Sequence, residues 1–419
     1  MSTTNLPLSG QRLWDSLMEM ARIGATPKGG CNRQTLTDLD SEGRHLLRRW
    51  AEAAGAVMTV DRVGNMMLTR PGRDPARKPV AFGSHLDTQP TGGKFDGVLG
   101  VLAGLEILRA VHEAGIETEA PLMLVNFTNE EGARFSPPMM GSGAAMGLFT
   151  EEEVLAKRDA EGRSFGEELV RIGWRGEADP AVLRDIAAFF ELHIEQGALL
   201  ERAGLEIGVV THALAQNWLE VTVEGEEAHG GSPMAGRRDA MMAAAPLIAA
   251  IERIALGAVT EAGEPGRATV GRLTVHPDSR NVAPSRVWFS VDTRHHDPAL
   301  LARMAEEIRD EAASLAAARG VRITVADFWH SPLTPFDPTL LGRVREAARR
   351  LGYGQMDMAA GIGHDAVHLA RRVPAALIFC PCHGGLSHNE AESITPAWAE
   401  AGMRVLAEAV LATAGIARH

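Results

Sequence analysis

Cysteine is scarce in this sequence. Its 419 residues include only three cysteines, Cys31, Cys380 and Cys382. An odd and sparse set of this kind argues against a disulfide framework and predicts reduced thiols in a cytoplasmic protein. The short pair Cys380 and Cys382 is also too little for a structural zinc site, which needs paired cysteine knuckles. We therefore expect these thiols in the core or in a pocket wall.

Long apolar segments and basic blocks are missing as well. No apolar run approaches the roughly 18 residues that a membrane span requires. The opening residues MSTTNLPLSG lack the charged and apolar regions of a secretory signal. The formal net charge is −12, and no Lys/Arg-rich block interrupts it. These absences argue against a membrane protein and against nucleic acid as the main partner, but not against a small anionic substrate.

The composition is that of a folded protein with substantial cores. Apolar residues make up 45% of the chain and charged residues 23%, which excludes a largely disordered chain. The length predicts about two to three domains. No internal repeat or low-complexity tract interrupts the sequence, so we expect ordinary globular domains.

Helical and strand patterns alternate in the first half of the chain. The expected helices cover 11–23, 37–54 and 98–112, and the expected strands cover 56–60, 66–69, 79–83, 122–127 and 188–192. This alternation predicts an α/β fold with a mostly parallel sheet covered on both faces. Functional residues in such sheets gather at the carboxyl ends of the strands.

The pattern changes at about residue 217. Strands are expected at 218–224, 268–275, 287–294 and 321–328, with helices at 239–255 and 298–318. The resulting β-α-β-β-α-β order is that of the ferredoxin-like unit, which folds as a compact module. We therefore predict a discontinuous first domain, residues 1–216 and 331–419, with residues 217–330 inserted as a second domain. The edge strand and helices of such a module offer a natural dimer surface.

Four short segments combine His, Asp and Glu with glycine next to expected strand ends. They contain His85, Asp87 and Asp96; Glu130 and Glu131; Glu191, His193 and Glu195; and His388 after the pair Gly384-Gly385. Taken singly, a His-x-Asp pair is common on surfaces, and two glutamates at a helix start are favoured by the helix dipole. Hydrolysis at a metal, however, needs both a carboxylate ligand and a free carboxylate base. Because four separate segments place such residues beside glycine at expected strand ends, we predict a metal centre.

These segments resemble the M20 family of metallo-amidohydrolases, and specifically its carbamoylase branch, over nearly the whole chain. The resemblance implies two divalent ions per subunit that are bridged by Asp96. One ion would be completed by His85 and His193, and the other by Glu131 and His388. His/carboxylate sites accept Zn, Mn, Co or Ni, so the pattern does not choose the metal.

The same resemblance assigns chemistry to neighbouring residues. Glu130 would be the general base, and Asp87 would support His85. Peptidase-like relatives usually place a carboxylate where this chain has His193, so the imidazole points to the carbamoylase branch. His193 and Gln196 argue against an aminoacylase or dipeptidase. Retention of Glu130 and of all five metal positions argues against a catalytically dead binding protein.

The resemblance further implies residues that contact a small substrate carrying a ureido group and a carboxylate. They are Gln196 for the ureido group, His229 for the oxyanion, Asn281, Arg294 for the carboxylate, and Gly363 and His364 in a G-x-G-H-D-A loop. A guanidinium suits a carboxylate because its planar fork can form two parallel hydrogen bonds. The inserted domain would close as a lid and bring Asn281 and Arg294 to the substrate, and relatives are homodimers.

The pattern leaves the substrate open among N-carbamoyl-L-amino acids, N-carbamoyl-β-alanine and allantoate. All three combine a ureido group with a carboxylate. We expect N-carbamoyl-L-amino acids because that group of enzymes is the broadest. The reaction would release the amino acid, carbon dioxide and ammonia.

Overall fold

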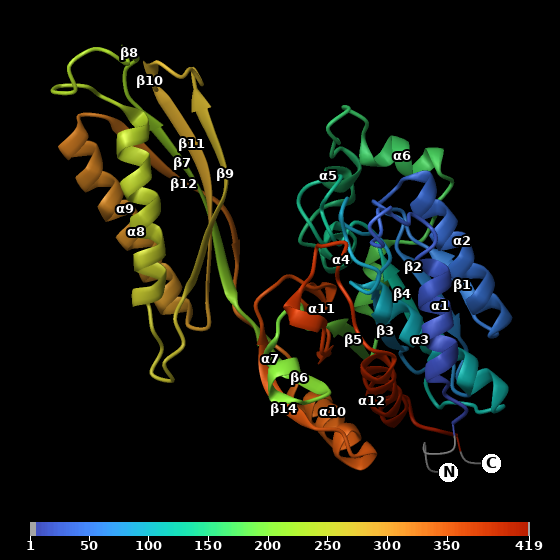
Figure 1. Ribbon diagram of the computed structural model, residues 1–419. Coiled ribbons are helices and arrows are strands. Elements are labelled where there is room, and N and C mark those ends of the chain that lie inside the picture. The colour runs from blue at the N-terminus through green and yellow to red at the C-terminus, as the bar shows by residue number, and fades with distance from the viewer. Residues whose placement is uncertain (1–5, 418–419) are drawn as a thin grey trace. The chain divides into compact units, whose positions relative to one another are not determined.

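The computed structural model describes residues 6–417, which divide into two compact units (Figure 1). Unit 1 comprises the residues up to Thr211, Pro335–Met358 and the residues from Gly363 onward. Unit 2 comprises His212–Thr334 and Ala359–Ile362. The segment expected as an insertion, 217–330, lies inside unit 2.

The described residues of unit 1 are built on a nine-stranded mixed sheet with the path β1-β2-β4-β3-β5-β15-β6-β13, and β14 pairs with β6. Its strands are β1 Val57–Val60, β2 Met66–Arg70, β3 Val80–His85, β4 Leu122–Phe127, β5 Ala188–Ile194, β6 Ile207–Ala213, β13 Thr334–Pro335, β14 Gln355–Ala360 and β15 Ala375–Cys380. Strands β4, β3, β5 and β15 are parallel neighbours. Every residue of these four strands is buried, as expected for a parallel sheet covered on both faces. The predicted mostly parallel sheet is confirmed.

The helices of unit 1 cover this sheet. They are α1 Gly10–Met20, α2 Asp38–Ala53, α3 Val98–Glu113, α4 Met140–Met146, α5 Glu151–Leu155, α6 Phe165–Arg171, α7 Leu199–Ala203, α10 Pro338–Leu351, α11 Asp365–Leu369 and α12 Pro396–Ala414. Helices α3 and α12 pack against β3 and β5 and against each other, and α11 packs against β5 and β15. Nearly all of α3 is buried, so the loop that leads into it is held by the core.

Unit 2 contains a four-stranded antiparallel sheet in the order β12-β7-β11-β9. Its elements are β7 Ala215–Glu224, α8 Ala240–Gly257, β9 Arg267–His276, β11 Arg286–His295, α9 Pro298–Arg319 and β12 Arg322–Ser331, with a short pair β8 Ala228–His229 and β10 Val282–Ala283. The β-α-β-β-α-β order predicted for the segment after about residue 217 is therefore confirmed. A separate antiparallel sheet with two helices follows the pattern change at about residue 217.

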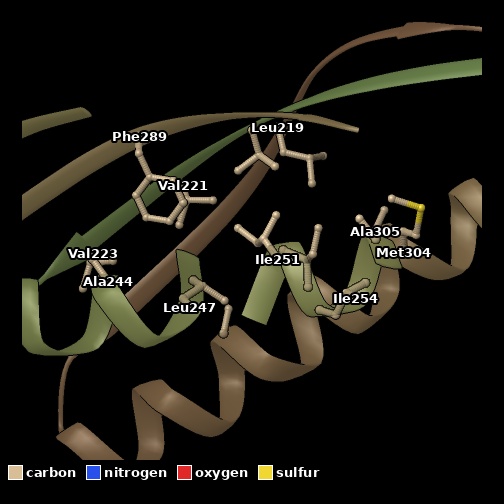
Figure 2. Packing of buried hydrophobic residues seen from close by; sticks show 14 of the residues in the cluster. Leu219, Val221, Val223, Ala244, Leu247, Ile251, Ile254, Phe289, Met304 and Ala305 are labelled. Carbon is tan, nitrogen blue, oxygen red and sulfur yellow. The ribbon is translucent and has the colours of Figure 1, made fainter. Parts of the chain in front are cut away.

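The core of unit 2 lies between its sheet and its two helices (Figure 2). Leu219 and Phe289 from the sheet belong to one buried cluster with Ile251 of α8 and Met304 of α9. Helix α8 is long and apolar enough to cross a membrane by length and composition alone, although Glu252 and Arg253 interrupt its apolar run. Since the apolar face of α8 packs on the sheet, this helix is a core helix of a folded domain.

Candidate metal centre

The site is assembled where neighbouring parallel strands of unit 1 end. His85 is the last residue of β3 and pairs in register with Phe127, the last residue of β4. His193 lies one residue before the end of β5 and pairs with Phe379 of β15. Because parallel strands present their carboxyl ends at one edge of a sheet, the segments that follow them converge there.

The first cluster consists of His85, Asp96 and His193, whose ligand atoms all lie within 4.8 Å of one another. The Nε2 atom of His193 lies 3.1 Å from Oδ1 of Asp96, and Nε2 of His85 lies 3.8 Å from the same oxygen. All three side chains are buried. Two imidazoles and a carboxylate oxygen therefore face one point.

The second cluster shares Asp96 with the first and adds Glu131 and His388. The Nε2 atom of His388 lies 3.3 Å from Oδ2 of Asp96 and 3.2 Å from Oε2 of Glu131. Asp96 thus directs one carboxylate oxygen at each cluster. Imidazole and carboxylate donors suit borderline divalent cations, and the paired clusters are consistent with a dinuclear metal site.

Charges within the clusters shift the pKa values of their members. Burial opposes ionisation of Asp96, but hydrogen bonds with His193 and His388 outweigh it and hold the pKa of Asp96 well below its usual value. Burial would lower the pKa of His193, but the hydrogen bond with Asp96 raises this pKa to about 9. Burial lowers the pKa of His85. These shifts pair the buried, ionised carboxylate of Asp96 with a protonated imidazole of His193.

Main-chain carbonyl groups orient the two buried imidazoles. The Nδ1 atom of His85 lies 2.9 Å from the carbonyl oxygen of Asp87, and Nδ1 of His193 lies 2.9 Å from that of Ile194. These contacts turn each Nε2 towards Asp96. The carboxylate of Asp87 instead accepts the backbone N–H groups of Glu130 and Glu131, each at 3.3 Å. Asp87 therefore contacts His85 chiefly through its main chain, with its Oδ1 atom 3.8 Å from Nδ1 of His85, and its carboxylate holds the loop of the two glutamates.

Glu130 lies beside the first cluster. Its Oε2 atom is 3.5 Å from Nε2 of His85. Burial, followed by the charges of Asp365 and other nearby carboxylates, raises the pKa of Glu130 well above its usual value. The preceding residue, Asn129, has a φ of 60°, and its side-chain amide donates to the carbonyl of Phe135 at 2.8 Å. Left-handed backbone at a residue other than glycine is typical of functional sites.

Close packing leaves no space for a side chain at Gly97. A Cβ atom there would lie 2.3 Å from the imidazole of His85, and the φ of Gly97 is 68°. Both observations require glycine next to Asp96. The glycine-rich composition of this loop, which the sequence analysis singled out, has this physical cause.

Gln196 lies against the shared carboxylate. Its side-chain nitrogen donates to Oδ2 of Asp96 at 3.0 Å and to Oγ of Ser387 at 2.8 Å. Its Oε1 atom is buried and has no hydrogen-bond partner among the residues that the structure describes. The amide is therefore fixed at one end and has an unused acceptor at the other.

His364 also joins this group. Its ring centroid lies 4.5 Å from that of His193. Burial and the nearby charge of His193 hold the pKa of His364 well below its usual value, and its Nε2 atom has no partner within residues 6–417. A Cβ atom at Gly363 would lie 2.7 Å from the side chain of Met139. His364 thus borders the first cluster, and Gly363 packs against Met139, whose backbone N–H donates to the carbonyl of Glu130.

Three of the expected substrate residues belong to unit 2, where they form two separate groups. His229 pairs with Val282 across β8 and β10, next to Asn281. Arg294 lies near the opposite end of β11, where its guanidinium contacts Asp292 at 3.1 Å and also the carbonyl of Gly361.

The length of β11 separates these two groups. Arg286, which follows β10, and Arg294 are eight residues apart on one strand, which corresponds to about 26 Å. Within unit 2, Asn281 and Arg294 therefore lie towards opposite ends of β11.

Several residues at the site carried no assignment from the sequence. Gln89 donates to Oε2 of Glu131 at 2.8 Å. Glu191 accepts a hydrogen bond from Ser84 at 2.6 Å and lies in a cluster with His193 and His364. A charged residue inside the apolar run of β5 was the available signal for Glu191. Gln89 offered no comparable signal because its contact depends on the course of a loop.

The family model for peptidase family M20/M25/M40 matches residues 81–412. The chain therefore belongs to this family, as the resemblance indicated. Within it, the chain is similar to members of the hydantoinase/carbamoylase branch. It is 50% identical to the N-carbamoyl-L-amino-acid amidohydrolase of Rhizobium meliloti, covering 98% of both chains. It is 37% identical to the N-carbamoyl-L-amino acid amidohydrolase of Geobacillus stearothermophilus, covering 95% of this chain and 97% of that protein.

A solved structure agrees with this placement. The hydantoinase/carbamoylase family amidase from Burkholderia vietnamiensis superimposes with a TM-score of 0.89 at 48% identity, covering 99% of both chains. The chain is thus an amidohydrolase of the carbamoylase branch, and the prediction of a metal-binding hydrolase is confirmed at that level.

Proposed function

We propose that this protein hydrolyses the ureido C–N bond of N-carbamoyl-L-amino acids and releases the amino acid, carbon dioxide and ammonia. The observation that carries this proposal is the convergence of His85, Asp96, Glu131, His193 and His388 in two clusters that share one carboxylate. The half-identical relative named for this activity supports the choice of substrate. The three free, buried cysteines support a cytoplasmic setting.

The two clusters would hold two divalent ions, with Asp96 as the bridge. Besides Asp96, His85 and His193 would coordinate one ion, and Glu131 and His388 would coordinate the other. Zn, Mn, Co and Ni all suit these donors, and availability decides among them. When bound, such a pair supplies Lewis acidity that activates water near neutral pH and polarises the ureido carbonyl.

Glu130 would move the proton in this reaction. Its carboxylate takes a proton from the attacking water and delivers it to the amino nitrogen that leaves, after which the carbamate fragment breaks down to carbon dioxide and ammonia. The raised pKa of Glu130 suits a base that must hold the proton between these two transfers. Asp87 would fix the base by holding the backbone of Glu130 and Glu131.

Buried groups with unused hydrogen-bonding capacity would recognise the ureido end of the substrate. Oε1 of Gln196 is an acceptor without a partner among the described residues, and a terminal ureido NH₂ group is a matching donor. The neutral ring of His364 and the backbone at Gly363 would line the same pocket. A substrate that has a methyl group in place of the ureido NH₂ leaves Oε1 of Gln196 buried and unpaired, which disfavours N-acetyl amino acids.

The substrate residues of unit 2 would act from two subunits of a homodimer. His229 and Asn281 lie at the β8–β10 pair, which precedes the start of β11, and Arg294 lies near the end of β11, whose residues Arg286 to Arg294 span about 26 Å. We therefore propose that one copy supplies His229 for the oxyanion together with Asn281, and that the second copy supplies Arg294 for the carboxylate. The exposed edges of the sheet, β9 and β12, are surfaces on which a second copy can pair.

The test of the substrate is a panel of ammonia-release assays. Metal-stripped protein is refilled with Zn, Mn, Co or Ni and offered N-carbamoyl-L-amino acids, N-carbamoyl-β-alanine and allantoate, with N-acetyl amino acids assayed for amine release. We expect the highest kcat/KM for an N-carbamoyl-L-amino acid. A higher value for allantoate or N-carbamoyl-β-alanine would reassign the substrate, and preference for the N-acetyl compound would indicate an aminoacylase.

The test of the base is the variant Glu130→Gln, which keeps the size of the side chain but cannot take up the proton. Loss of a general base lowers kcat by about 10²- to 10⁴-fold. The metal content of the variant serves as the control and should equal that of the unchanged protein. Turnover at the unchanged rate would refute the assignment of Glu130.

A further inference from the structure

The loop that carries Asp96 is held by a residue from the opposite end of the chain. Oε1 of Glu392 accepts the backbone N–H of Phe95 at 3.0 Å and that of Asp96 at 3.1 Å. The Glu392 side chain is buried, with the whole residue 2% exposed. Because backbone N–H groups at this point precede the first turn of α3 and lack helical partners, Glu392 supplies the acceptor that the loop needs.

Ser387 extends this contact to the Asp96 side chain. Its hydroxyl lies 3.0 Å from Oδ2 of Asp96 and 3.3 Å from Oε2 of Glu392. Glu392 and Ser387 together, here called the Asp96 brace, therefore contact both the backbone and the carboxylate of Asp96. This is the carboxylate that the two clusters share, so a displacement of the loop would disturb both clusters.

Glycine in the Asp96 loop leaves space for the side chain of Glu392, a member of the Asp96 brace. A Cβ atom at Gly93 would lie 2.0 Å from the carboxyl carbon of Glu392. No positive φ is involved at Gly93, so the close approach of Glu392, rather than backbone conformation, requires glycine there. A Cβ atom at Gly30 would similarly lie 2.7 Å from the Cα atom of Glu390. The segment 387–392 thus packs closely against Gly93 of the Asp96 loop and against Gly30 of the neighbouring segment.

The geometry points to Glu392 as a positioning residue that sets the direction of the Asp96 carboxylate and thereby the affinity of both clusters for divalent cations. This inference rests on the proposed function, because it takes the two clusters to be a metal pair. Glu392 does not reach the clusters with its own ligand atoms and acts through the backbone of Phe95 and Asp96 and through Ser387. Partners of this kind orient metal ligands and typically change metal affinity by about 10- to 100-fold when they are removed.

The test compares Co²⁺ binding to four variants with binding to the unchanged protein. Glu392→Ala removes the acceptor, and Gly93→Ala keeps Glu392 but pushes its carboxylate out of place. Glu392→Gln retains an amide oxygen for the two backbone N–H groups. The matched control is Glu106→Ala, because Glu106 is also a buried glutamate that accepts a backbone N–H, from Ser9 at 2.8 Å, and an ion pair from Arg12, with no contact to either cluster among these bonds.

Two readouts separate positioning from general destabilisation. Chelator competition gives the Co²⁺ affinity, and the visible absorption bands of bound Co²⁺ report its coordination geometry. We expect about a 10- to 100-fold loss of affinity and altered bands in Glu392→Ala and Gly93→Ala, with both properties restored in Glu392→Gln. The control Glu106→Ala should melt at a lower temperature but bind Co²⁺ with unchanged affinity and unchanged bands.

The inference is overturned if Glu392→Ala and Gly93→Ala bind Co²⁺ as the unchanged protein does, or if Glu106→Ala loses as much affinity as they do. If Glu392→Ala does not fold, Gly93→Ala alone decides, since it retains every polar group. Failure of the unchanged protein to bind a pair of Co²⁺ ions would instead overturn the metal centre of the proposed function. The two failures are therefore distinguishable.

Discussion

The separation between His229 and Arg294 leads to a prediction about mixtures of inactive subunits. Each side chain reaches only a short distance from its backbone, whereas about 26 Å of strand separates the two ends of the sheet. If each active site takes His229 from one copy and Arg294 from the other, His229→Ala and Arg294→Ala should each lose activity. Loss of an oxyanion donor lowers kcat by about 10²- to 10³-fold.

A mixture of the two variants should regain activity. Random pairing in a two-fold symmetric dimer makes half of the dimers mixed, and each mixed dimer has one site with both residues intact. The unseparated mixture is therefore expected to recover about a quarter of the unchanged activity, and the isolated mixed dimer about half. The assay co-expresses the two variants with different affinity tags, isolates the mixed dimer by two purification steps and measures ammonia release from an N-carbamoyl-L-amino acid.

A second pair of variants provides the control. His229 and Asn281 lie together at the β8–β10 pair, so they enter a given site from the same copy. A mixture of His229→Ala with Asn281→Ala should stay inactive, because both sites of the mixed dimer then lack one residue. If the mixture of His229→Ala with Arg294→Ala is no more active than either variant alone, the shared site is refuted. If the control mixture regains activity, the grouping of His229 with Asn281 is refuted.

Three further predictions concern the metal site and the core of unit 2. Gly97→Ala combines a left-handed backbone that costs about 1–2 kcal/mol with a Cβ atom 2.3 Å from His85; elemental analysis should find fewer bound ions and calorimetry a lower Tm. The pKa of His193 is raised to about 9, so an ion that binds there displaces a proton and Co²⁺ affinity should rise about tenfold per pH unit between about pH 7 and 9; a flat profile in chelator competition would contradict this. Phe289→Ala should lower the free energy of unfolding in denaturant by about 3–5 kcal/mol, because Phe289 is fully buried in unit 2, while the metal content of unit 1 stays unchanged.

The sequence by itself determined the elements and the location of the site. The alternation of strand and helix patterns identified the buried strands β3, β4 and β5, and the β-α-β-β-α-β order after about residue 217 identified the elements of unit 2. Because parallel strands end at one edge of a sheet, residues that follow them had to converge, which brought His85, Glu131 and His193 together from positions far apart in the chain. The motif segments therefore predicted a metal centre at this edge of the sheet, and the resemblance to the M20 family implied how its ligands divide between two ions.

Only the tertiary structure decided how the ligands are supported and where the substrate residues lie. Glu392 accepts hydrogen bonds from backbone N–H groups of the Asp96 loop. Every residue except proline has such a group, so these bonds cannot be predicted from the residue types of the donors. The carboxylate of Asp87 likewise accepts the backbone N–H groups of Glu130 and Glu131, while its Oδ1 atom lies 3.8 Å from Nδ1 of His85. The distance between His229 and Arg294 followed from strand length and pairing in unit 2. Side-chain type and spacing along the chain encode chemistry and local structure, whereas loop paths and separations within a sheet arise only when distant segments pack.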